Sequence, residues 1–586
     1  MLQLLKNFAI TKYCFLNSFP KILVRSSILN SSNIRRVTTS CTNTNIVDPS
    51  TLEFTKRNET ILKDLPKYYP SLSEFVCTDV SKCPSILSPE DFHNQYKDIK
   101  QDLSNEIVQV GGRIKKIRFS GKKMAFIQLI GGLNNTTLQI ILNYRIINEH
   151  KSVAIETFHD YLHHFIKPGD YIMLKGFPGL SQREKTLSLK SIELPSFLSI
   201  RQLPLPPQLN DKAKIKTNRV VQYLINRTGD RFLPDNDIIL LRSKVYRIIR
   251  DYLNDKKFIE VETPILNGNS NGANAKPFIT KLNALSSDKL NNQVNLELRI
   301  APELWLKRLI IGGYERVYEL GKVFRNESVD STHNPEFTTL ETYGSFMTME
   351  DLILLSEELF RKIIMAVNTD TSIELRNILS VNNWKFKRVE FIPTLSKELN
   401  VPLQELRERI ESLESKDLEI QKNSIKYLET FLPSSNCSSS SPQQVLDKLC
   451  GEYIEKKYCN DLHPAIIYHH PKIMSPLAKN NYKDNNLTSK RFEIFIRGKE
   501  FLNAYEEENC PQEQLTKFIN QQLQKTKYGD LESLKVDLFY VEAMKWGMPP
   551  TGGLGLGIDR LLMLLSGSKR IEEVLSFGTV DDVLRQ

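Results

Sequence analysis

Residues 321–343, GKVFRNESVDSTHNPEFTTLETY, form the stretch that decides the fold of this chain. Apolar and β-favouring residues flank a turn-forming run at 328–334, so the pattern predicts a β-hairpin with charged side chains near its bend. Arg325 offers a planar fork that suits phosphate or carboxylate. Glu327 and Glu341 could accept hydrogen bonds from an amino group or hold a divalent cation. A solvent-exposed charged turn explains the same residues without a ligand. The hairpin alone does not distinguish these two interpretations, so the other motifs of the chain are needed.

The 586 residues are 40% hydrophobic and 25% charged, which is typical of soluble globular protein with several domains. The net charge is +10, but residues 1–47 contain six Lys and Arg and no Asp or Glu, which leaves +4 for residues 48–586. This mildly basic remainder is compatible with a nucleic-acid partner. The eight cysteines form no CxxC pair, so we expect reduced thiols rather than a zinc site.

The start of the chain has the composition of a targeting segment. Residues 1–47 combine basic, apolar, Ser and Asn residues, which predicts a mitochondrial presequence that is later removed. A disordered basic tail is the alternative. A secretory signal is disfavoured because Lys and Arg interrupt every apolar run. No stretch reaches about 18 apolar residues, so we expect no membrane span and no stable membrane association.

Beyond the presequence, the pattern predicts a helical lead-in at 48–104 and a β-barrel at 105–198. Five β-rich runs between 108 and 194, with glycines at the corners, suit a partly open OB-fold, which often binds single-stranded nucleic acid. A purely structural barrel or an SH3-like module is the alternative. A proline-rich basic linker follows at 199–235, and residues 236–586 mix helices and strands in one α+β domain.

Two stretches before the hairpin carry polar groups that their surroundings do not explain. In residues 271–280, NGANAKPFIT, Gly272 would let a ligand approach the backbone closely, although an ordinary Gly/Asn turn is the simpler explanation of this stretch alone. In residues 299–307, RIAPELWLK, Glu303 lies on an otherwise apolar helical piece, where a carboxylate needs a cation. A helix first-turn charge after a proline is the alternative.

Two stretches after the hairpin also carry polar groups that their surroundings do not explain. In residues 491–508, RFEIFIRGKEFLNAYEEE, Glu493 and Glu500 could share a divalent ion that a nucleoside triphosphate would bring, or lie on a solvated edge strand. Residues 551–567, TGGLGLGIDRLLMLLSG, superficially look like a dinucleotide loop, but no apolar strand precedes them. We expect these glycines to pack against a flat ligand, with Arg560 directed at it. A Gly-rich turn that caps a core helix is the alternative.

Together these stretches resemble the three signature motifs of class II aminoacyl-tRNA synthetases. FIEVETPIL resembles the end of motif 1 (about 240–264), FRNES…HNPEFTTLETY resembles motif 2 (about 318–343), and GLGLGIDRLLML resembles motif 3 (about 551–567). The upstream barrel matches the lysine, aspartate and asparagine subgroup. APELWLKRLIIGGYERVYELGKVFRNE, HNPEFTTLE and KIMSPLAK resemble lysyl-tRNA synthetases in particular, and the presequence matches a mitochondrial form.

The resemblance implies an α+β fold, with an N-terminal OB-fold β-barrel that binds the anticodon and a class II synthetase catalytic domain built on an antiparallel sheet with flanking helices. The implied activity is that of a lysine–tRNA ligase, which activates L-lysine with ATP and Mg²⁺ and transfers it to the 3′ end of tRNA(Lys). The implied assembly is a homodimer through motif 1, and the implied location is the mitochondrial matrix.

The resemblance also assigns roles to individual residues. It implies catalytic roles for Arg325 and Arg560, and Mg²⁺ binding by Glu493 and Glu500. The residues implied to bind ATP are Arg325, Glu327, His333, Asn334, Phe337, Glu493, Glu500 and Arg560. The residues implied to bind lysine are Gly272, Glu303, Tyr343, Asn503, Tyr505 and Glu507, although the family often has Phe in place of Tyr505. The residues implied to read the anticodon are Phe126, Gln139 and Glu193.

The charges themselves predict lysine. An ε-ammonium that leaves water needs a partner, and Glu303 and Glu507 would supply two carboxylates. Aspartate would need a cation there, and neutral asparagine would leave two buried carboxylates without one. Asparaginyl- or aspartyl-tRNA synthetase is the alternative within the subgroup. A non-catalytic relative usually lacks Arg325, Glu500 or Arg560, all present here, and a synthetase-like enzyme that lysylates proteins would lack the barrel.

Overall fold

The structure is a computed structural model, and it describes residues 57–75, 85–203, 218–229, 234–269, 272–273, 275–282, 295–433, 441–528 and 534–578. The predicted presequence at 1–47 and the first part of the predicted lead-in lie outside these residues. The described lead-in contains a helical stretch at 57–63 and then α2 (Leu65–Tyr68). Among the described residues, no helix is both long and apolar enough to cross a membrane.

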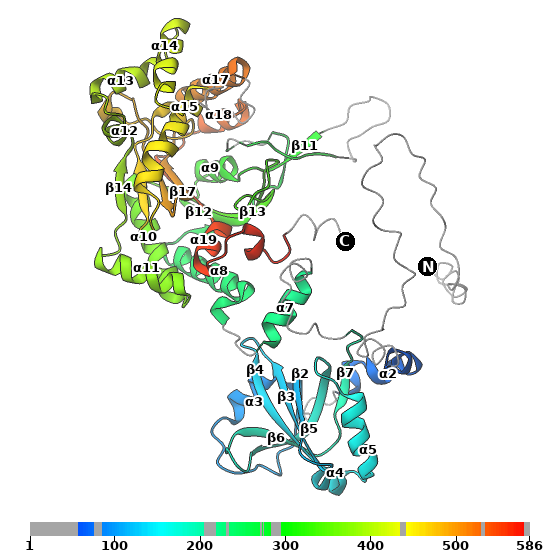
Figure 1. Cartoon of the computed structure of the whole chain (residues 1–586). Coiled ribbons are helices and arrows are strands. Elements are labelled where there is room, and N and C mark those ends of the chain that lie inside the picture. Colours follow the sequence, from blue (N-terminus) through cyan, green and yellow to red (C-terminus); the bar gives the residue numbers. More distant parts are fainter. Residues whose placement is uncertain are drawn as a thin grey trace, which may run out of the picture.

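The N-terminal body is a closed five-stranded barrel (Figure 1). Its strands pair in the order β2-β3-β4-β6-β5, and β5 pairs back with β2 to close the ring. Their bounds are β2 (Val108–Phe119), β3 (Met124–Gly131), β4 (Thr136–Asn143), β5 (Tyr171–Leu180) and β6 (Leu187–Ser191). Alternate side chains such as Ile114, Ile127 and Leu174 are fully buried inside. The predicted OB-like barrel is therefore confirmed.

Short elements complete this body. Strands β1 and β7 extend the sheet at its two ends, and helices cover the barrel. The bounds are β1 (Ile86–Leu87), α3 (Pro89–Tyr96), α4 (Tyr144–His150), α5 (Ile155–Asp160), η2 (Tyr161–Phe165) and β7 (Ser196–Ser199).

The predicted linker contains a helix, α7 (Arg219–Thr228), which the sequence analysis did not identify because proline and basic residues dominate its surroundings. Arg227 donates hydrogen bonds of 3.0 Å to the carbonyls of residues 132 and 133 in the β3–β4 turn. At the other end, Arg219 and Tyr223 donate to main-chain carbonyls between residues 572 and 576. Helix α7 therefore connects the barrel to the C-terminal segment of the second, larger body (Figure 1).

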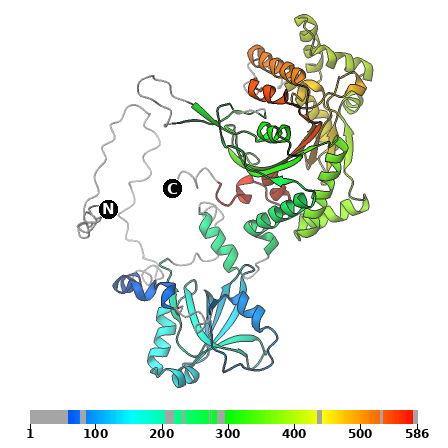
Figure 2. The same ribbon diagram turned by 180° about the vertical axis from the view of Figure 1, so that it is seen from behind.

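The second, larger body, seen from behind in Figure 2, contains a large sheet with helices packed around it. This sheet has eight strands in the order β14-β15-β16-β17-β18-β13-β12-β8. The strands from β15 to β12 are antiparallel, whereas β14 and β8 run parallel to their neighbours at the two edges. The bounds are β8 (Ile259–Glu260), β12 (Arg316–Phe324), β13 (Glu336–Ser345), β14 (Lys387–Glu390), β15 (Ala465–Tyr468), β16 (Arg491–Ile496), β17 (Lys499–Glu506) and β18 (Thr551–Gly557).

Helices pack on this sheet and bury the largest apolar core. The apolar stripe of α8, which includes Leu241, Val245 and Ile249, packs into this core together with α10 and α19. The bounds are α8 (Ile238–Asp255), α10 (Met349–Ala366), α11 (Asp370–Val381) and α19 (Ile558–Ser566). Elsewhere on the sheet lie α9 (Glu303–Ile311), α17 (Pro511–Tyr528), α18 (Leu538–Met544) and a small sheet of β9 (Leu266–Asn267), β10 (Ile279–Lys281) and β11 (Asn295–Leu298).

A helical insertion between β14 and β15 has its own core, to which Leu395, Leu406 and Leu446 contribute. Its helices are α12 (Phe391–Leu399), α13 (Leu403–Ser412), α14 (Leu418–Glu429) and α15 (Pro442–Leu449). The three free cysteines among the described residues, Cys450, Cys459 and Cys510, form no disulfide.

The β-hairpin that was predicted from residues 321–343 is confirmed. Strands β12 and β13 pair antiparallel, with Val323 opposite Phe337. The alternative of a Gly-rich turn in residues 551–567 is wrong for residues 551–557, because they form β18, a central strand between β13 and β17. Close packing of the glycines does occur, but against neighbouring side chains: a Cβ at Gly553 would lie 1.9 Å from Oε1 of Glu507.

This packing predicts unequal effects of two similar substitutions. Gly553→Ala should lower the free energy of unfolding by about 1–3 kcal/mol, the usual effect of overpacking. Gly555→Ala is the control, because the nearest atoms to its added Cβ lie 3.8 Å away. Thermal denaturation measures both, and equal melting temperatures for the two variants would contradict the packing described.

Candidate active site

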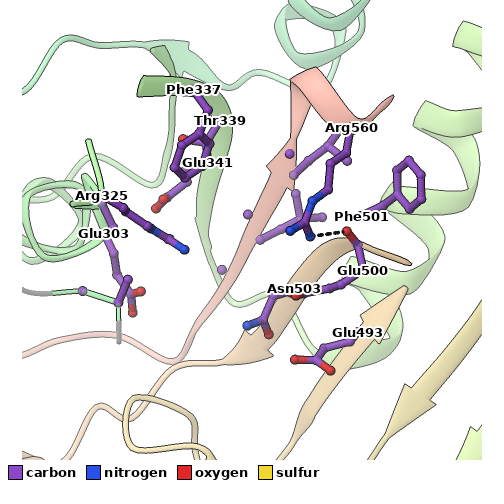
Figure 3. A pocket seen from close by; sticks show the side chains of 18 of the residues that line it. Glu303, Arg325, Phe337, Thr339, Glu341, Glu493, Glu500, Phe501, Asn503 and Arg560 are labelled. Carbon is purple, nitrogen blue, oxygen red and sulfur yellow. Dashed lines mark hydrogen bonds between the residues drawn. The ribbon is translucent and has the colours of Figure 1, made fainter. Parts of the chain in front are cut away.

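A cavity of about 680 Å³ lies over the middle strands of the eight-stranded sheet. Its walls come from the loop between β12 and β13, from β13, β16, β17 and β18, from α9 and from the start of α19 (Figure 3). The predicted ATP and lysine residues that line it are Gly272, Glu303, Arg325, Glu327, His333, Asn334, Phe337, Tyr343, Glu493, Glu500, Asn503, Tyr505 and Arg560. The structure thus brings together residues from five stretches that are far apart in the chain.

Two arginines reach into the cavity (Figure 3). The guanidinium of Arg325 lies 5.1 Å from the ring centroid of Phe337, within range of a cation–π contact. Arg560 donates to the carbonyl of Glu500 at 2.7 Å and to Nε2 of His333 at 3.0 Å. Nδ1 of His333 in turn lies 2.8 Å from Asp330. Two cations beside an aromatic ring suit an anionic ligand that carries a flat ring.

The acidic pair differs in its surroundings. Although burial opposes the shift, Arg491 and His470 lower the pKa of Glu493 to about 2, and both contact its carboxylate. Burial and the nearby Glu493 raise the pKa of Glu500, and its carboxylate makes no hydrogen bond to another described residue. Mg²⁺ takes one or two carboxylates together with substrate phosphates. This donor set therefore fits a magnesium ion that arrives with a nucleotide.

The opposite end of the cavity contains an ion cluster. Oε1 of Glu303 accepts hydrogen bonds from Lys307 at 2.5 Å and from the hydroxyl of Tyr505 at 2.7 Å. Lys307 also pairs with Glu507, and both of these side chains are completely buried. Although burial opposes the shift, Glu303 and Glu507 raise the pKa of Lys307. The cluster is thus two carboxylates around one internal ammonium.

The ion cluster changes the charge balance from which lysine was predicted as the ligand. Glu303 and Glu507 are not without a cation, because Lys307 supplies one. Glu507 also lies behind the cavity wall, whereas Glu303 lines it. Lys307 follows Glu303 by four residues, the spacing at which helix side chains pair. That spacing in RIAPELWLK was the signal that could have identified it.

Glu341 is a candidate acceptor for an amino group, but the residues predicted to bind lysine or ATP do not include it. It lies on β13, lines the cavity, and accepts a hydrogen bond of 2.9 Å from the hydroxyl of Tyr343. Burial and the charge of Glu303 raise the pKa of Glu341 to about 8. A buried carboxylate in this state gains strongly from an ammonium ligand.

Two further polar residues support the site and were not predicted. Arg491 donates to Asn503 at 3.0 Å and contacts Glu493, so it orients both. Asp559 accepts from the backbone of Thr338 at 2.7 Å and pairs with Arg242, which ties β13 to α19 and α8. Neither carries a sequence signal beyond its charge, because their partners come from other segments.

The predicted anticodon residues lie on the barrel. Register pairs Gln128 with Gln139, and Arg118 with Phe126, so these four side chains share the outer face of β2, β3 and β4. The third predicted residue, Glu193, follows β6, and its carboxylate pairs with Lys151 at 2.7 Å. The shared face combines an aromatic ring, amides and a basic group.

The structure combines an antiparallel sheet that contains this hairpin, a glycine-rich strand that leads into a helix, and an OB-like barrel upstream. This combination is that of class II aminoacyl-tRNA synthetases. The family model for class II tRNA synthetases (D, K and N) matches residues 232–581. The mitochondrial lysine–tRNA ligase of Saccharomyces cerevisiae is 47% identical over 92% of this chain and 94% of its own length. That of Schizosaccharomyces pombe is 38% identical over 87% and 90%, and the lysine–tRNA ligase of Mycoplasma mycoides is 35% identical over 83% and 90%. The chain belongs to the lysine–tRNA ligase family of class II tRNA synthetases.

The raised pKa of Glu341 predicts pH-dependent binding of an amino acid. A bound ammonium would lower that pKa, so binding releases a proton below about pH 8. Affinity should therefore weaken as the pH falls from 8 to 6, by up to about tenfold per unit. Isothermal titration should show a much flatter profile for Glu341→Gln. The exposed Glu336, on the same strand, is the control: Glu336→Gln should keep the wild-type slope. If the affinity of Glu341→Gln depended on pH as strongly as that of the wild type, the role of Glu341 in binding the ammonium would be refuted.

Proposed function

We propose that this chain is a lysine–tRNA ligase that activates lysine with ATP and transfers it to the 3′ end of tRNA(Lys) for mitochondrial translation. The observation that carries the proposal is the cavity with two chemically different ends. One end holds Arg325, Arg560 and Glu500, and the other holds the cluster around Glu303 and the buried Glu341. Relatives named as lysine–tRNA ligases support the same assignment.

The charges at the second end favour lysine once Lys307 is counted. Glu303 and Glu507 contact the one internal ammonium, that of Lys307, and Glu341 is a third carboxylate, whose pKa is raised by burial and by the nearby charge of Glu303. Any amino acid brings one α-ammonium, which suits Glu341 beside Tyr343. A second negative charge then remains for the side chain, and the ε-ammonium of lysine supplies its partner. Asparagine and aspartate leave that charge unmatched.

In the first step, the lysine carboxylate attacks the α-phosphorus of ATP and pyrophosphate leaves. We assign Arg325 to the α-phosphate and the lysine carboxylate, and Phe337 to the adenine, with Arg560 over the opposite face. No side chain needs to act as a nucleophile, so this chain contributes by positioning and by stabilising charge. Glu493 and Glu500 would hold the Mg²⁺ ion, which neutralises triphosphate charge.

In the second step, a hydroxyl of the tRNA 3′ end attacks the adenylate carbonyl, an ester bond to the tRNA forms, the acyl–phosphate bond breaks and AMP leaves. We assign recognition of the anticodon to the barrel face, where Phe126 would stack on a base and Gln139 would read base edges. Glu193 belongs to this proposal through its family match, and its pairing with Lys151 would have to open or adjust.

We propose that the chain works as a homodimer in the mitochondrial matrix. Support for the dimer comes from the edge strand β8, which ends motif 1 and contains the exposed Ile259, and from the exposed Ile265 and Leu266 shortly after it. Such an apolar edge is usually covered in a soluble protein. Support for the location comes from the mitochondrial relatives and from the composition of residues 1–47.

The amino acid is tested by ATP–pyrophosphate exchange with lysine, asparagine or aspartate. Lysine should support exchange, and the other two should not, because only lysine matches the charge at Glu303. Glu303→Ala should abolish lysine-dependent exchange while the protein keeps its fold by circular dichroism. Exchange with asparagine or aspartate instead of lysine would reassign the chain to a sibling enzyme.

The anticodon role is tested by separating the two steps. Phe126→Ala should lower aminoacylation of tRNA(Lys) by at least about tenfold, because stacking contributes roughly 1–3 kcal/mol per base. Exchange in the absence of tRNA should be unchanged, since Phe126 is outside the cavity. Phe165→Ala, a partly exposed aromatic on η2, is the matched control and should affect neither step. An equal loss of both steps in Phe126→Ala would contradict the role.

A further inference from the structure

Lys307 is a charged side chain that the two reaction steps above do not use. It lies on α9 with no exposure to solvent and does not line the cavity. Its ammonium contacts Glu303 and Glu507, and it lies 5.6 Å from the ring centroid of Tyr505 and 6.0 Å from that of Tyr540. A buried ammonium in this position is costly unless its two partners remain ionised.

Glu507 marks where a second cation belongs. Its Oε1 atom is buried and has no hydrogen-bond partner among the described residues. This oxygen lies 1.9 Å from the position that a Cβ on Gly553 would take, and Gly553 lines the cavity. The unpaired oxygen is therefore held at the cavity wall by the absence of a side chain. A buried acceptor of this kind needs a donor.

We propose that Lys307 is a specificity-determining positioning residue, which holds Glu303 and Glu507 ionised and limits the pocket to one further positive charge. With the ligand bound, the charges alternate around a ring: Glu303, Lys307, Glu507 and the ligand ammonium. This inference rests on lysine as the substrate. Lys307 acts through the two carboxylates and does not touch the reacting atoms.

The ring explains why a ligand with a neutral side chain is rejected. Burial raises the pKa of Glu507, and Lys307 opposes this shift. When both carboxylates are ionised, they and Lys307 together carry a net charge of −1, and one ligand ammonium neutralises them. Norleucine, which has a similar length without the ammonium, would leave this charge buried and unpaired. Without Lys307 the two carboxylates would repel each other, and one of them would take up a proton. The pocket would then lose its fixed geometry.

The test is a double-substitution cycle, read as the KM for lysine in ATP–pyrophosphate exchange by the full chain. Lys307→Met changes the net charge of the cluster from −1 to −2, and Glu507→Gln changes it to 0. Each should raise the KM for lysine at least tenfold while the KM for ATP changes less than twofold. The double variant restores −1, so its KM for lysine should be lower than that of either single variant.

The change in the KM for lysine from the single variants to the double variant distinguishes a positioning role of Lys307 from simple packing. If Lys307 only fills space, the two effects add and the double variant has the highest KM for lysine, which would overturn the proposal. If Lys307→Met does not fold, Glu507→Gln and the double variant are compared directly, and a double variant no better than Glu507→Gln would also overturn it. Glu507→Gln should further reduce the preference for lysine over norleucine at least tenfold, and an unchanged preference counts against the proposal.

A second buried lysine provides the matched control. Lys517 pairs with Glu508 at 2.8 Å, is largely buried, and does not line the cavity. Lys517→Met should lower thermal stability but leave the KM for lysine within twofold, and a tenfold rise there would show that any broken buried pair disturbs the pocket. If the wild-type chain shows no lysine-dependent exchange, the proposed function fails before the variants are compared.

Discussion

The site depends on a strand that carries almost no side chains. Strand β18, TGGLGLG, lies between β13 and β17 in the middle of the sheet and has glycine at four of its seven positions. Because Gly553 has no Cβ, Glu507 and the ring of Tyr343 can lie across it. The same strand leads directly into α19, which begins with the turn that carries Arg560. One backbone constraint thus fixes both ends of the cavity.

The two ends of the cavity pose opposite electrostatic problems. At the nucleotide end, Arg325 and Arg560 form no ion pair within the described part of the chain, and Arg325 lies against the ring of Phe337, which suits phosphate next to a base. At the amino-acid end, carboxylates outnumber the single internal ammonium of Lys307. Each end needs a ligand of the opposite charge, and the proposed substrates bring one to each. Buried charges without such partners would be costly, so the arrangement of charges in the site is preorganised for these ligands.

Much of this architecture was predictable from the sequence, because local patterns determine it. The alternation around residues 321–343 predicted the hairpin, and the five β-rich runs predicted the barrel. Helix α7 was missed because proline and basic residues surround it, and β18 was not predicted as a strand because glycine has a low propensity for strands. In that strand, tertiary packing overrides propensity. The role of Lys307 depends on Glu507, two hundred residues away, so only the fold could reveal the complete cluster.

The central claim is that the ion cluster around Glu303 receives the side-chain ammonium of lysine. A crystal structure of the chain with a non-hydrolysable lysyl-adenylate analogue tests it most directly. The account predicts the ε-ammonium within hydrogen-bond distance of Glu303 and of Oε1 of Glu507, with Lys307 still between the two carboxylates. An ε-ammonium bound elsewhere, or a Lys307 displaced from the pair, would contradict it.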